Sequence, residues 1–110
     1  MRFRLLVTVL SILALTGTSM SAHAGTFTSA EFLEWKQENK EAYIMNAIGM
    51  ATLVVARYDN THAKCISDMF RDDEQGVYKY TLDAMAQHPE FHPRATILAV
   101  IEKKCQKLGK

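Results

Sequence analysis

The stretch MAQHPEFHPRATILAVIEKKC, residues 85–105, decides how the fold of this chain is closed. Pro89 stops the helix before it, because proline has no backbone N–H and clashes with the preceding turn. Pro93 fits the first turn of the next helix, where a missing N–H costs little. Apolar residues then recur at helical spacing, at Ile97, Leu98 and Ile101. The stretch therefore predicts a last helix that ends on the thiol of Cys105, close to the end of the chain.

The opposite end of the chain has the pattern of a secretory signal. Arg2 and Arg4 precede an apolar run over residues 5–15, and Ala22-His23-Ala24 follows as an A-x-A cleavage site. The apolar run is shorter than the roughly 20 residues that a spanning helix needs. We therefore expect residues 1–24 to be a signal peptide removed after Ala24, and residues 25–110 to form one domain exported to the periplasm, with no membrane attachment after cleavage.

Charge narrows the possible partners of the exported domain. The full chain has 13 Lys and Arg against 12 Asp and Glu, and two of the basic residues, Arg2 and Arg4, belong to the expected signal peptide. The remainder has a formal net charge of −1 and no basic run. This balance argues against nucleic acid or an anionic membrane surface as a partner. A domain of this size buries a modest share of its surface and often depends on disulfides or oligomerisation.

The only two cysteines, Cys65 and Cys105, predict such a disulfide. In an oxidising compartment an isolated pair is typically bridged, although two free thiols or an intermolecular bridge are alternatives. The closed loop of about 40 residues corresponds to roughly 4 kcal/mol of stability in the chain-entropy model. The bridge would explain why the last helix ends on a thiol.

Four helical segments are expected, with no strand signal. A capping box from Thr28 to Glu31 begins a short helix that buries apolar residues of the next turn, namely Phe32, Leu33 and Trp35. A longer helix begins at Asn39 or Lys40 and continues to about Tyr58. Residues 59–62 interrupt the pattern and lead into a connection around Cys65. These elements predict an all-α fold, a compact bundle of about four helices closed by one disulfide.

The third expected helix begins near Asp72, Asp73 and Glu74, whose carboxylates suit a helix N-terminus, and continues to Gln87. Its inward residues are expected to be Val77, Tyr80, Thr81, Ala84 and Met85. The fourth helix begins at Pro93, with its inward line made of Ile97, Leu98, Ile101 and Cys105.

The second expected helix is apolar on most of its sides. One line of apolar residues recurs at steps of three and four, namely Tyr43, Ile44, Ala47, Ile48, Ala51, Val54 and Val55. Met50, Leu53 and Ala56 widen this line almost all the way round. Such a helix is usually central in a bundle or shared with a partner, which favours a homodimer.

Catalytic and metal sites find little support in the sequence. His88 and His92 have a spacing typical of metal ligands on one helix, but Pro89 and Pro93 interrupt that helix. We expect His88 near a helix end and His92 as the cap of the next helix. His62 beside Cys65 suggests a base and a thiol, yet Cys65 has a better partner in Cys105. Sequence motifs of hydrolases, zinc proteases and phosphate-binding loops are absent, so we expect no enzyme activity, no cofactor and no metal.

Several short motifs, taken in order, resemble the Rap/Tai immunity proteins. They are SAEFLEW at 29–35, YIMNAIGMA at 43–51, Cys65-Ile66, YTL at 80–82, HPE at 88–90, and Cys105. The resemblance covers nearly all of the exported domain. It implies a helical, dimeric periplasmic protein that protects a bacterium by occluding the substrate groove of a peptidoglycan amidase effector of a type VI secretion system. A second disulfide common in that family is absent here, since Lys36 and Ile44 stand at its positions.

Two other functions remain open at this stage. The HdeA-like periplasmic acid-stress chaperones are similar in size, helical and closed by one disulfide, although their first cysteine lies on the opening helix. A structural periplasmic protein without a toxin partner is the third possibility.

An inhibitor that enters a groove needs a protruding polar segment, and residues 67–74 are the best candidate. We expect Asp68, Phe70, Arg71 and Asp72 to bind the partner, with Phe70 as an exposed aromatic anchor. The alternative is that the acidic residues favour a helix N-terminus and that Phe70 belongs to the core.

Overall fold

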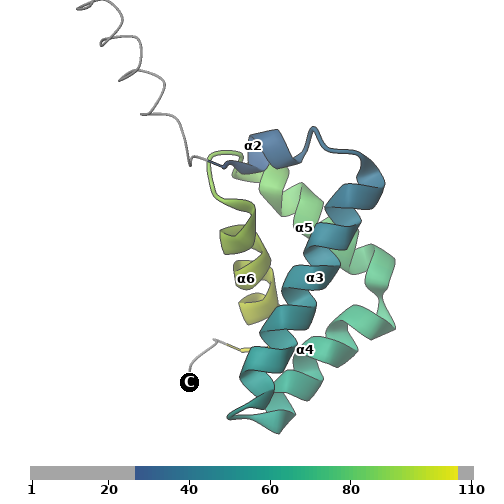
Figure 1. The fold of residues 1–110 in the computed structure, drawn as a ribbon, viewed down its shortest axis with the longest axis vertical. Coiled ribbons are helices and arrows are strands. Elements are labelled where there is room, and N and C mark those ends of the chain that lie inside the picture. Colours follow the sequence, from purple (N-terminus) through teal and green to yellow (C-terminus); the bar gives the residue numbers. More distant parts are fainter. Residues whose placement is uncertain (1–26, 107–110) are drawn as a thin grey trace, which may run out of the picture.

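A computed structural model describes residues 27–106 of the chain, so the expected cleavage site after Ala24 lies outside the described residues. α-Helices are the only regular elements of this part of the chain (Figure 1). They are α2 (Ser29–Phe32), α3 (Gln37–Ala56), α4 (Asn60–Asp72), α5 (Glu74–Gln87) and α6 (Pro93–Lys104). The long α3 packs against α4 and α6, and α2 packs against α5. The all-α fold predicted from the sequence is confirmed.

The ends of α5 and α6 follow local sequence chemistry, as predicted. The side chain of Asp73 accepts a hydrogen bond from the backbone N–H of Gly76 at the start of α5. Pro93 is the first residue of α6, and Nδ1 of His92 accepts from the backbone N–H of Arg94 at 3.1 Å. His92 therefore caps α6, as expected.

The expected connection around Cys65 is wrong, because residues 60–72 form the helix α4. Only a short turn separates α3 from α4. The carboxylate of Asp59 accepts from the backbone N–H of His62 at 2.9 Å and so begins a new helix directly after the turn. The new helix buries His62, Ala63 and Ile66. The bundle of residues 27–106 therefore has five helices instead of about four.

The first helix of the described region is short and docks on the loop between α5 and α6. Thr28 caps α2 as predicted: its hydroxyl accepts from the backbone N–H of Glu31 at 3.3 Å and also donates to the Glu31 carboxylate at 3.2 Å. The backbone N–H and the hydroxyl of Ser29 both donate to the carbonyl of Phe91 at 2.8 Å. Since Ser29 is fully buried, these bonds fix α2 to the bundle.

An aromatic cluster covers the junction of α2 and α3. Phe27 stacks on Trp35 with 5.5 Å between ring centroids, and Phe32 lies between Trp35 and Tyr43. Phe32 is buried as predicted, whereas Trp35 is 41% exposed and is less buried than expected. The helix α3 begins at Gln37, two residues earlier than expected, and a hydrogen bond from Gln37 to Glu41 supports its first turn.

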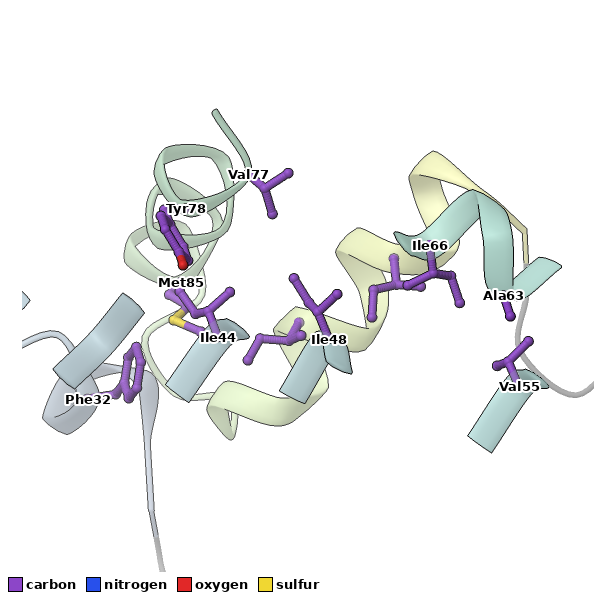
Figure 2. Packing of buried hydrophobic residues seen from close by; sticks show 11 residues of the cluster. Phe32, Ile44, Ile48, Val55, Ala63, Ile66, Val77, Tyr78 and Met85 are labelled. Carbon is purple, nitrogen blue, oxygen red and sulfur yellow. The ribbon is translucent and has the colours of Figure 1, made fainter. Parts of the chain in front are cut away.

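The core lies where α3, α4, α5 and α6 converge. Ile44, Ile48 and Val55 extend from α3 into this core, as Figure 2 shows. The other members of this buried apolar cluster are Phe32, Ala63, Ile66, Val77, Tyr78, Met85, Ile97 and Ile101. Two predicted inward residues are wrong: Tyr80 is 37% exposed and Leu98 is 43% exposed. Tyr78 is buried in place of Tyr80, so α5 is rotated from the orientation that its apolar spacing indicated.

The predicted disulfide between Cys65 and Cys105 is confirmed. It joins the middle of α4 to the residue after α6, across a sequence separation of 40. Both cysteines are half-buried, and Cys105 packs against the core. The bridge therefore holds the last helix against α4 at the end of the molecule opposite α2 (Figure 1).

Reduction of this disulfide is expected to lower the melting temperature by about 10 °C or more, because a loop of this length corresponds to several kcal/mol. Thermal melts followed by circular dichroism, with and without a thiol-free reductant, measure the shift. The double variant Cys65→Ser/Cys105→Ser is the control, since its melting temperature should be low and insensitive to the reductant. An oxidised protein with two titratable thiols under denaturant would contradict the prediction.

The buried Tyr78 makes stability sensitive to alkaline pH. Burial, together with the hydrogen bond to the Glu74 carboxylate at 3.0 Å and the charge of that carboxylate, raises the pKa of Tyr78 from 10.0 to about 12. Between these two values an unfolded tyrosine ionises while the folded one stays neutral. The contribution of Tyr78 to stability is therefore complete below pH 10 and is lost as the pH rises toward 12.

We expect Tyr78→Phe to be less stable at neutral pH by about 1 kcal/mol, the usual worth of one hydrogen bond. Between pH 10 and 12, however, the variant should lose less stability than the wild type. Urea unfolding at a series of pH values measures both effects. Tyr58→Phe is the matched control, because Tyr58 is 54% exposed. Its replacement should leave the dependence of stability on pH the same as in the wild type. Parallel pH profiles of wild type and Tyr78→Phe would contradict the assignment.

Candidate functional site

The residues expected to bind a partner lie on α4, where the structure forms a charged edge made of Lys64, Asp68, Arg71 and Asp72. The carboxylate of Asp68 accepts from Lys64 Nζ at 2.5 Å and from the guanidinium of Arg71. The hydrogen bond from Lys64, assisted by the positive charges of Lys64 and Arg71, lowers the pKa of Asp68 against the opposing effect of desolvation. Both cationic side chains are more than two thirds exposed. Exposed ion pairs of this kind add little to folding stability, so these groups are available to an outside partner.

The protruding segment expected at residues 67–74 is not present, because the helix α4 continues to Asp72 and α5 follows after a single residue. The expected exposed anchor Phe70 is half-buried, with its ring edge-on to Tyr78 at 5.5 Å between centroids. The core alternative for Phe70 is therefore the better description. Of the acidic residues, Asp73 caps α5, whereas Asp72 is exposed at the end of α4. Of the other members of the expected site, Arg71 and Asp72 are exposed and Asp68 is half-buried.

Beside the charged edge, α3 exposes large apolar side chains. Met45, Met50, Leu53 and Val54 are 44%, 62%, 68% and 50% exposed. No charged residue occurs between Ala42 and Ala56. The sequence indicated that α3 is apolar on most sides, and the structure adds that only the side with Ile44, Ile48 and Val55 is covered.

Two grooves border the exposed part of α3. The larger, of about 760 Å³, lies between α3 and α4, and Phe70 and Arg71 line its α4 wall. The smaller, of about 300 Å³, lies between α3 and α6 and is lined almost wholly by apolar groups, with Arg94 as its one charged residue. Met50 borders both grooves. This combination of an apolar ridge, two grooves and a charged edge is suited to protein binding.

The histidines do not assemble into a site in the described residues. His62 is buried, and neither of its ring nitrogens has a hydrogen-bond partner in this part of the chain. Cys65, its suggested nucleophilic neighbour, is bonded to Cys105. His88 lies near Glu90 at 4.0 Å and stacks on Phe91, while His92 caps α6. Residues 27–106 contain no group of three or more His, Cys, Asp or Glu side chains arranged to hold a metal ion.

Sequence reasoning missed one feature of this surface. The helical form of residues 60–72 brings Lys64 beside Asp68. The spacing of four between Lys64 and Asp68 is the signal that indicates the ion pair once the segment is taken as a helix.

Comparisons of this chain with protein families, with curated proteins and with solved structures found no match. None of the helices within residues 27–106 combines the length and the apolar character that a membrane span requires.

Proposed function

We propose that this protein is a periplasmic immunity protein that binds and inhibits a peptidoglycan amidase effector of a type VI secretion system. The ordered motifs that resemble the Rap/Tai proteins, from residue 29 to Cys105, are the source of this specific function. A small helical domain closed by one disulfide agrees with that resemblance. In this proposal the N-terminal 24 residues export the protein, which acts without chemistry of its own.

The observation that carries the proposal is the charged edge of α4 next to exposed apolar surface. Lys64, Asp68 and Arg71 pair in solvent, where their contribution to folding is small. Charged groups at the rim of an interface mainly set specificity and association rate, and apolar groups nearby provide affinity. Arg71 belongs to the charged edge and also lines the groove between α3 and α4. An effector placed over Asp68, Arg71 and Asp72 would therefore contact both kinds of surface.

The triple variant Asp68→Ala/Arg71→Ala/Asp72→Ala should bind the amidase at least about tenfold more weakly than the wild type, which is 1.4 kcal/mol. Its melting temperature should stay within a few degrees of the wild-type value, because Arg71 and Asp72 are exposed and the half-buried Asp68 pairs with exposed cations. Isothermal titration calorimetry with type VI peptidoglycan amidase effectors, each first tested for binding to the wild type, measures the affinity.

The matched control is Lys79→Ala/Asp83→Ala, which removes another exposed ion pair, of 2.8 Å, on α5. This control should bind like the wild type. Equal affinities of the triple variant and the wild type would move the effector surface away from α4. Absence of amidase binding by the wild type would overturn the proposed function itself.

A second candidate is an acid-stress chaperone, and the uncharged exposed side of α3 is the observation that favours it. Near pH 2 the carboxylates are neutral while Lys, Arg and His keep their charges, so the chain becomes strongly cationic. A chaperone would then open and hold client proteins through its apolar surface.

If the protein is an inhibitor, it should fail to suppress aggregation of unrelated client proteins at either acid or neutral pH. Light scattering of an acid-sensitive client, at pH 2 to 3 and after return to pH 7, measures this activity. Suppression at acid pH alone would favour the chaperone over the immunity protein.

A further inference from the structure

The groove between α3 and α6, of about 300 Å³, exists because α3 has small residues on the side that faces α6. Ala47 and Ala51, one helical turn apart, both line it. Their side chains end at Cβ, so the two helices pack side by side without filling the space between them (Figure 1). The buried Val55 and Ile97 also line the groove, which therefore extends to the core.

Nearly all of the groups that line this groove are apolar. Tyr58 and Arg94 are its only lining residues whose side chains contain nitrogen or oxygen. The backbone groups of the other lining residues belong to α3 and α6 and are hydrogen-bonded within those helices. A peptide bound here would leave its own buried N–H and C=O groups without partners, at a cost for each of them. A hydrocarbon chain has no such groups, so the groove favours an alkyl chain over a peptide.

Arg94 gives the groove one positively charged end. It lines the groove between α3 and α6 and also a neighbouring hollow beside Tyr43 and Asn46, so it lies where the two meet. Arg94 is exposed, and its guanidinium forms no ion pair or hydrogen bond within residues 27–106. Asp and Glu are absent from the described lining of both hollows. The charge of Arg94 is therefore available to an anionic group of a bound molecule.

We propose that this groove binds a medium-chain fatty acid, with its carboxylate on Arg94 and its alkyl chain between Ala51 and Leu98. A guanidinium holds a carboxylate through two parallel hydrogen bonds. One arginine balances the single charge of a carboxylate, whereas a phosphate monoester carries about two charges. The volume is at the low end of the roughly 300–1,000 Å³ range of small-molecule sites, which suits one alkyl chain and not a lipid with two.

The fatty-acid groove is separate from the surface proposed for the effector. That surface is on α4, and the groove beside it lies between α3 and α4. Met50 borders both grooves, but of the two grooves Arg94 and Leu98 line only the one between α3 and α6. The inference therefore goes beyond the proposed function and does not depend on it.

A nuclear magnetic resonance titration of the isotope-labelled protein with octanoate tests the site. The amide signals of residues 51–58 and 94–98 should shift, and the Kd should be below about 1 mM, since a ligand with so few atoms makes limited contact. Octanol, which has the same chain length without the carboxylate, should shift the same signals with a higher Kd. Acetate, which lacks the chain, should leave them unchanged.

Arg94→Gln tests the contact with the carboxylate. This variant should bind octanoate at least about tenfold more weakly and octanol with unchanged affinity, because only octanoate is charged. Its melting temperature should stay within a few degrees of the wild-type value, since the guanidinium has no partner to lose within residues 27–106. Lys103→Gln is the matched control: it removes an exposed cation of the same helix that does not line the groove, and it should bind octanoate like the wild type.

Leu98→Glu tests the contact with the alkyl chain. Leu98 is 43% exposed, so the variant should stay folded, but a charge in the apolar part of the groove should weaken octanol binding at least about tenfold. Ala99→Glu is the matched control, because it places the same charge at the next position of α6, which is exposed and does not line the groove. This control should bind octanol like the wild type.

The inference is overturned if the wild type does not bind octanoate, or if Arg94→Gln affects octanoate and octanol equally. Flotation with anionic phospholipid vesicles separates a free fatty acid from a membrane: binding to vesicles without binding of octanoate would assign the groove to a lipid surface and would also overturn it. An amidase that binds the wild type while octanoate does not would leave the proposed function intact and reject the fatty-acid site alone. The opposite result would retain the site and reject the proposed function.

Discussion

The structure depends on one constraint: within residues 27–106, the 20-residue helix α3, uncharged from Ala42 to Ala56, has only four shorter helices to cover it. A chain of this length buries a limited share of its surface, so one side of α3 receives the core and the others stay in contact with water. Ile44, Ile48 and Val55 take the covered side. The two grooves beside α3 and the exposed Met45, Met50, Leu53 and Val54 are the consequence of that shortage.

Because the core is small, hydrogen bonds at the helix starts and a covalent link at the chain end matter for the stability of the fold. Asp59, Asp73 and His92 each accept a hydrogen bond from a backbone N–H at the start of a helix. The disulfide then holds the end of α6 against α4. It closes a loop between two residues that are 40 apart in the sequence. Caps and a covalent link thus supply stability that a larger domain would obtain from apolar burial.

The parts of the fold that depend on local chemistry were predictable from the sequence, namely the cap at Thr28, the start of α6 at Pro93 and the disulfide. The turn before α4 was not, because Asp59 and Asn60 suit a turn and a helix cap equally well. The burial of Tyr78 instead of Tyr80 depends on how α5 meets its neighbours, which periodicity alone does not fix. On the surface, the charges of Asp68, Arg71 and Asp72 were identified, but the half-burial of Phe70 follows from its contact with Tyr78.

The exposed apolar side of α3 and the charged edge of α4 differ in the physics of the contacts that they favour. Apolar contact on α3 responds little to salt, whereas attraction to Asp68 and Arg71 weakens as ionic strength rises. The two kinds of contact therefore respond to different conditions, although the two surfaces are adjacent. Arg71 lines the groove whose other wall is formed by Met45, Gly49 and Leu53 of α3, so any molecule bound in this groove meets both surfaces at once.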